Sequence, residues 1–185
     1  MTPAHTTTLL IATFLAAFAQ ASLDGPRRLL GAQVDLVTPL VVYAALRGSL
    51  GSTTLVAVCG GLWLDALSEN PLGASLLPLY LPAFLIQTQR GVILRDQAFA
   101  QAVLGGGASA VFVILSLILL LTMGRSPAVG WGTLWVVVVA AGGGALLVPG
   151  YSLFFARLEK VLFHQPRLRP GFDPQRQIKR DRSLS

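Results

Sequence analysis

Long apolar stretches separated by short polar ones dominate this sequence. Six of them approach the roughly 17–25 residues that a helix needs to cross a bilayer. We place them at residues 6–23, 31–47, 52–68, 72–89, 99–123 and 130–149. The apolar runs are continuous and do not alternate as the strands of a membrane barrel would, and helices satisfy every backbone hydrogen bond without water. The pattern predicts an all-α, polytopic integral membrane protein with about six transmembrane helices.

The connections between these stretches are short and rich in turn-forming residues. Gly, Pro, Asn and Ser recur in them, for example in Asp24-Gly25-Pro26 and Ser68-Glu69-Asn70-Pro71. Short links join neighbouring antiparallel helices, so we expect residues 1–150 to form an up-down transmembrane bundle without a soluble domain. The second stretch contains Asp35 and Pro39, which interrupt its apolar run. If it does not cross, the number of spans becomes odd.

Composition agrees with the lipid setting and argues against catalysis. Apolar residues make up 54% of the chain and charged residues 12%, against roughly 45–50% and 25% in soluble domains. The two histidines, His5 and His164, lie at opposite ends, so no nucleophile has a base beside it in the sequence. Cys59 is the single cysteine and lies in an apolar run. We expect no enzyme activity and no catalytic, metal or cofactor site.

The basic residues are distributed unevenly and predict an orientation. With the N-terminus in the cytoplasm, the inner side carries Arg47, Arg90, Arg95 and eight Lys and Arg residues from Arg157 onward, whereas the outer side carries Arg27, Arg28 and Arg125. Positive charge accumulates on the cytoplasmic side of membrane proteins. The C-terminus is therefore predicted to be cytoplasmic, with its basic tail contacting anionic lipid. Few aromatic residues accompany these charges, which disfavours nucleic acid as a partner.

The region after Pro149-Gly150 is predicted to leave the bundle. Proline and glycine interrupt the sixth stretch, and residues 151–164 then alternate apolar and basic positions at helical spacing. We expect a juxtamembrane amphipathic helix on the inner surface there, with an extension of the sixth span as the alternative. Residues 165–185 are rich in Pro, Arg and Gln and are predicted to be a disordered, basic cytoplasmic tail.

Two acidic residues and one row of small residues are candidate functional positions. Asp35 and Asp65 lie near outer helix ends, where they either cap a helix or face the bundle interior to pair with Arg27, Arg28 or a partner protein. A row of small residues, Ala98, Ala102, Gly106 and Ala110, recurs every four positions in the fifth stretch. Such rows allow close helix packing, either within the chain or with the spanning helix of a partner.

Residues 60–84, GGLWLDALSENPLGASLLPLYLPAF, resemble the rod shape-determining protein MreD family. The family pattern has a glycine and an aspartate at the end of one span, a short polar loop, and Leu-Gly at the opening of the next. Gly61, Asp65, Pro71, Leu72 and Gly73 match that pattern in place. Residues 34–51 also resemble the second span of the family, with Asp35 near its start and Arg47 at its end.

The resemblance implies a non-enzymatic subunit of the bacterial elongation (rod) complex in the inner, or plasma, membrane. Such a protein supports cell shape and lateral peptidoglycan synthesis by scaffolding an MreC-like protein, and through it MreB, RodA and a penicillin-binding transpeptidase. The alternative is the vitamin-binding membrane subunit of an energy-coupling transporter, which also has six helices. That alternative requires polar residues to converge on a ligand from several outer helix ends.

Overall fold

The computed structural model describes residues 3–22, 31–68, 71–89, 97–124 and 130–162. Within these ranges the regular secondary structure is entirely helical, and there is no strand. The helices are α1 Pro3–Ser22, α3 Val37–Arg47, α4 Leu50–Leu67, α5 Leu76–Gln89, α6 Ala98–Thr122 and α7 Trp131–Leu162. Their order matches the apolar stretches, so the all-α prediction is confirmed. In α4, in α6 and over Trp131–Leu158 of α7, the helices are long and apolar enough to cross a membrane.

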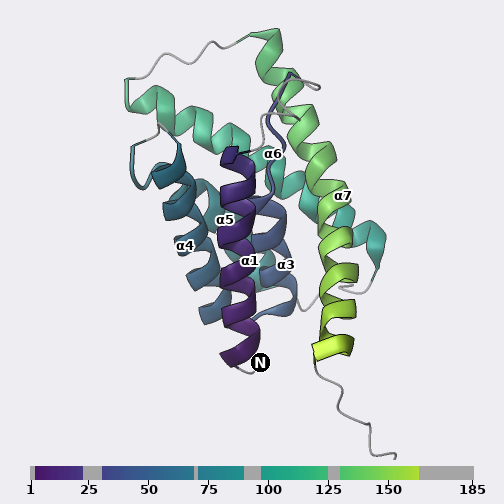
Figure 1. Ribbon diagram of the computed structural model, residues 1–185. Helices are drawn as coiled ribbons and strands as arrows, with labels where there is room; N and C mark the ends of the chain where they lie inside the picture. Colours follow the sequence, from purple (N-terminus) through teal and green to yellow (C-terminus); the bar gives the residue numbers. More distant parts are fainter. Residues whose placement is uncertain (1–2, 23–30, 69–70, 90–96, 125–129, 163–185) are drawn as a thin grey trace, which may run out of the picture.

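Helix α3 is the centre of the bundle. Every residue from Val37 to Leu46 is buried, and α3 packs against α1, α4, α5, α6 and α7. A helix that is apolar on all sides requires such surroundings. Figure 1 shows α3 enclosed among the other helices. The helix begins at Val37, so the predicted second span, 31–47, is helical only in its second part. Its 11 residues extend over about 16 Å.

The late start of α3 has a local cause. The Asp35 carboxylate oxygen Oδ1 accepts hydrogen bonds from the backbone N–H groups of Val37 and Thr38, each at 3.1 Å. These N–H groups lie in the first turn, where a helix offers no carbonyl partner. A side chain that accepts them sets the start of the helix. Residues 31–36 therefore approach α3 as non-helical backbone.

Helices α6 and α7 cross at close range, and Figure 1 shows α6 running obliquely past α7. Gly105 and Gly144 lie at the crossing. A β-carbon on either glycine would collide with the backbone carbonyl oxygen of the other. Small residues allow helix backbones to approach this closely. Gly105 and Gly144 are therefore explained by contact within the chain.

The predicted break after Pro149 does not occur, and this differs from our expectation of a separate helix over 151–164. Helix α7 continues through Pro149 to Leu162. Proline removes one backbone hydrogen bond, but packing against the start and the body of α3 holds the following turns. The Tyr151 hydroxyl donates to the Leu36 carbonyl at 3.2 Å, and the Phe155 ring stacks on Tyr43 with centroids 4.9 Å apart. Residues 163–185, including the predicted tail, lie outside the described residues.

The beginning of α1 and the end of α7 lie at the same end of the molecule (Figure 1). We call this the inner end, after the predicted orientation, and the opposite end the outer end. An even number of passes through the bundle produces this arrangement. The predicted loop charges Arg27, Arg28, Arg90, Arg95 and Arg125 lie outside the described residues.

Candidate functional site

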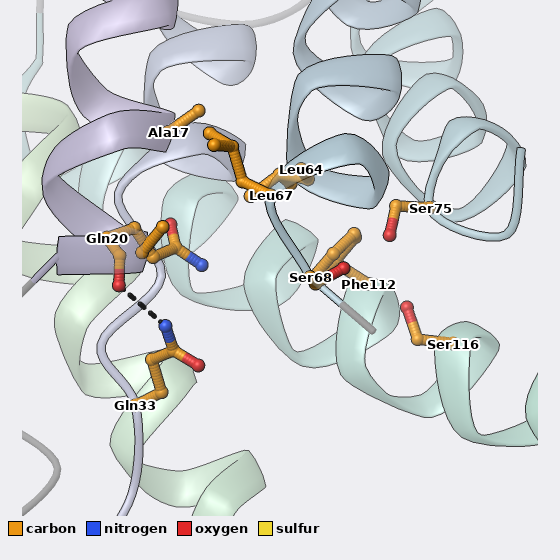
Figure 2. Close-up of a pocket in the computed structure, with 10 residues that line it drawn as sticks. Ala17, Gln20, Gln33, Leu64, Leu67, Ser68, Ser75, Phe112 and Ser116 are labelled. Atoms are coloured by element: carbon orange, nitrogen blue, oxygen red, sulfur yellow. Dashed lines mark hydrogen bonds between the residues drawn. The ribbon is translucent and has the colours of Figure 1, made fainter. Parts of the chain in front are cut away.

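A cavity of about 220 Å³ lies at the outer end, between α1, α4, α6 and the turn that precedes α5. Figure 2 shows the side chains around it. Its polar lining consists of Gln20, Gln33, Ser68, Ser75 and Ser116, and Leu64, Leu67 and the Phe112 ring contribute apolar surface. Of the described residues that line it, none is charged. These residues offer an uncharged guest hydrogen-bonding groups and an apolar wall.

Gln20 connects the end of α1 to the non-helical segment before α3. Its backbone carbonyl accepts a hydrogen bond from the Gln33 amide at 2.8 Å. Its side-chain oxygen accepts the backbone N–H of Leu36 at 2.9 Å. A backbone donor inside an apolar bundle needs such an acceptor. These two bonds hold Gln33 against one wall of the cavity, as Figure 2 shows for the bond to Gln33.

Asp65 organises the turn between α4 and α5. Its carboxylate is buried, with Oδ2 accepting the Gly73 N–H at 2.7 Å and both oxygens accepting the Ser75 N–H at 3.1 and 3.2 Å. Gly73 has a φ of +95°, a conformation that favours glycine. This arrangement, which we call the Asp65 turn, places Ser75 at the cavity wall. Asp65 therefore contacts backbone N–H groups just before α5, in agreement with the capping role that was one of the two predicted from the sequence.

Gly61 allows the Asp65 turn to lie close to α4. A β-carbon on Gly61 would lie 2.8 Å from the Leu76 Cα atom, closer than real side-chain carbons come. The first residue of α5 thus packs directly on the α4 backbone. Gly61, Asp65 and Gly73, which the sequence identified separately, belong to one structural unit.

One buried hydroxyl group at the cavity has no hydrogen-bond partner in the part of the chain that the structure describes. The Ser116 hydroxyl on α6 is buried and accepts or donates no hydrogen bond there. In Figure 2 the Ser75 and Ser116 hydroxyls point into the same space from opposite walls. A buried polar group without a partner costs about 1–3 kcal/mol. A guest that bonds to Ser116 would recover part of that cost.

Asp35 lies away from the cavity, at the start of α3. Its Oδ1 atom caps α3, whereas Oδ2 and the neighbouring Thr38 hydroxyl are buried and have no hydrogen-bond partner among the described residues. The alternative partners Arg27 and Arg28 lie outside those residues. The structure therefore assigns Asp35 a capping contact and leaves its second oxygen for another group.

The members of the predicted row of small residues on α6 differ in how deeply they are buried. Gly106 is buried, and a β-carbon on it would lie 3.0 Å from the Ala141 carbonyl oxygen on α7. Ala98 is exposed, and Ala102 and Ala110 are half-buried. The buried face of α6 instead follows Gln101, Gly105 and Ser109, one position earlier in the helical repeat. The row is thus the edge of the contact with α7 rather than its centre.

Sequence reasoning missed the residues that line the cavity. Gln20, Gln33, Ser75 and Ser116 are neutral and belong to four segments that are far apart in the sequence. Only the packing of α1, α4 and α6 brings them together. The one available signal was the location of Gln20 and Gln33 at the ends of apolar stretches.

The described residues contain no group of three or more His, Cys, Asp or Glu side chains that could hold a metal ion. Cys59 is half-buried and free. Comparisons with protein-family models, with curated proteins and with solved structures found no match for this chain.

Proposed function

We propose that this protein is an MreD-like, non-enzymatic subunit of the bacterial elongation complex. It resides in the plasma membrane with its C-terminus in the cytoplasm, supports lateral peptidoglycan synthesis, and maintains cell shape by scaffolding partner proteins. The observation that carries the proposal is the Asp65 turn. Residues that match the MreD pattern meet there, and the turn that they form places Ser75 in the lining of the cavity.

Contacts within the Asp65 turn connect residues that are each common at helix ends. Asp65 bonds to backbone groups eight and ten residues later in the chain, and Gly61 provides the space for the same segment. A carboxylate provides two oxygens for these N–H groups. The contacts support the proposal because the residues that carry the resemblance act together in one turn.

The cavity offers a docking site for a segment of a partner. Amide and hydroxyl groups are matched to the backbone N–H and C=O groups of a peptide, and the apolar wall is matched to one of its side chains. We propose that the MreC-like protein is held there, and that MreB, RodA and the transpeptidase associate through it. The basic tail would contact anionic lipid on the cytoplasmic side.

The test replaces the chromosomal copy in its own host with a Ser116→Trp variant, which fills the cavity. Thr122→Trp is the matched control, because Thr122 lies on the same helix, is exposed, and does not line the cavity. We expect rounded cells and reduced co-purification of the MreC-like protein with S116W, and rod-shaped cells with T122W. Rods with normal levels of S116W would exclude the cavity as the docking site. Unchanged shape after depletion of the whole protein would exclude the function.

A second candidate is favoured by the same cavity, which gathers neutral polar groups at outer helix ends. That is the arrangement expected of a vitamin-binding subunit of an energy-coupling transporter. Depletion would then leave cell shape unchanged and create a requirement for the vitamin in the medium.

A further inference from the structure

A second hollow, the α5–α6 groove, lies between α5 and α6 and has a volume of about 280 Å³. Its walls are apolar and include Leu85, Ile86, Val103 and Val111, with Gly107 and Ala108 among the small residues. Gln89, the last residue of α5, is the one polar residue among the described residues that line it. No residue is shared with the polar cavity at the outer end.

The dimensions of the groove match one leaflet of a membrane. Helix α6 is long and apolar enough to span a bilayer, and the groove follows it from Val103 to Val111, about 12 Å along the axis. One leaflet contributes about half of the 30 Å hydrocarbon core. Gln89 is exposed and lies toward the inner end, at the level where a lipid chain joins its polar headgroup.

Gly107 leaves the groove open. In the run Gly105-Gly106-Gly107, the first two glycines pack against α7, whereas no atom lies within 4 Å of a β-carbon built on Gly107. Glycine inside a helix costs about 1 kcal/mol relative to alanine. Contact within the described chain does not account for this third glycine, but space for a guest does.

We propose that the α5–α6 groove binds one acyl chain of a membrane lipid from the inner leaflet. One turn of a helix about 10 Å wide and 5.4 Å long occupies roughly 400 Å³, so the groove is too small to enclose a partner helix. An extended hydrocarbon chain is narrower, requires no polar partner, and can place its ester group beside Gln89. This inference goes beyond the proposed function and does not depend on it.

The experiment uses the full-length protein in vesicles that contain phosphatidylethanolamine with a diazirine on one acyl chain. After illumination, the labelled positions are mapped by mass spectrometry. Val103 in the groove and Val138 on the outward face of α7 are matched probes, because they are 56% and 60% exposed. A bound chain is expected to label Val103 several-fold more than Val138, whereas freely exchanging lipid labels them equally.

Two variants test whether the excess comes from the groove. Gly107→Leu fills it, and Gly142→Leu adds the same side chain to α7 at a glycine that also has open space around it. We expect G107L to abolish the excess and G142L to retain it. Should G107L fail to fold, as judged by gel filtration and thermal unfolding, Val111→Phe fills the groove from its other end and decides in its place. Equal labelling in the wild type, or an excess that survives groove filling, would overturn the proposal.

Discussion

At the residue scale, Asp65 has the most demanding role. One buried carboxylate accepts hydrogen bonds from the N–H groups of both Gly73 and Ser75. We expect Asp65→Ala to lower the free energy of unfolding by about 3 kcal/mol, and Asp65→Asn by about 1–2 kcal/mol because one acceptor oxygen remains. Thermal unfolding of the detergent-solubilised protein measures both. Ser68→Ala is the control, since Ser68 is exposed and its hydroxyl contacts only the backbone carbonyl of Asp65, not the carboxylate. Equal stability of D65A and S68A would contradict this role.

Substitutions of Asp35 can distinguish its role in capping α3 from a role in charge pairing. Asparagine retains the Oδ1 acceptor for Val37 and Thr38 and exchanges one buried unpartnered atom for another. We therefore expect Asp35→Asn to unfold close to the wild-type temperature, whereas Asp35→Ala loses about 1–2 kcal/mol of stability. If a cation or a partner pairs with the second oxygen, D35N folds normally but does not support rod shape. Destabilisation of D35N as large as that of D35A would show that the charge itself is needed for folding.

Residues that act at helix ends were predictable, whereas residues that act across helices were not. Asp65 lies where an apolar run stops, and Gly61 and Gly73 match the MreD pattern together with it, so all three were identified from the sequence. Ser75 and Ser116 face each other only because α5 and α6 are packed at a particular rotation. The predicted row on α6 was one position away from the buried face, because small residues lie on both sides of the boundary between the buried and the exposed face.

At the element scale, the crossing of α6 and α7 is the contact most sensitive to size. A larger residue at Gly105 would collide with the Gly144 carbonyl and with Val148. We expect Gly105→Val to destabilise the protein by about 1–3 kcal/mol or more, because the two backbones must separate. Gly107→Ala is the matched control two positions later, with open space around its β-carbon, and it is expected to be neutral or slightly stabilising. Thermal unfolding of the two variants makes the comparison, and a G105V variant as stable as G107A would argue against the close crossing.

The positions of the helices were predictable from the lengths of the apolar stretches, whereas the ends of the helices depend on contacts with other parts of the chain. All six apolar stretches contain a helix, because lipid requires internally satisfied backbone. The start of α3 depends on an acceptor side chain, Asp35, and the continuation of α7 past Pro149 depends on Tyr151 and Phe155 packing against α3 and the residues that precede it. Local propensity predicted a break at Pro149, and tertiary packing outweighed it.

At the scale of the whole molecule, charge and fold give consistent indications of orientation. The chain has a formal net charge of +6 and its basic residues are concentrated after Arg157. The start of α1 and the end of α7 lie at one end of the bundle (Figure 1). The positive-inside tendency predicts that this end is cytoplasmic. In the proposed orientation, the cavity with its neutral polar lining would open toward the outer side, and the α5–α6 groove would lie in the inner leaflet.

This orientation makes a prediction that depends on the whole chain. Green fluorescent protein fused after Ser185 or before Met1 is expected to fluoresce in a bacterial host, because the proposed orientation has both ends in the cytoplasm. Alkaline phosphatase fused at either end is expected to be inactive, since that enzyme requires an oxidising exterior. Alkaline phosphatase placed after residue 124, in the connection between α6 and α7, is the matched control and should be active. Active phosphatase at the N-terminus together with a fluorescent C-terminal fusion would indicate an odd number of spans. The short helix α3 would then be the segment that enters the bundle without crossing the bilayer, since its 11 residues cover only about half of the hydrocarbon core.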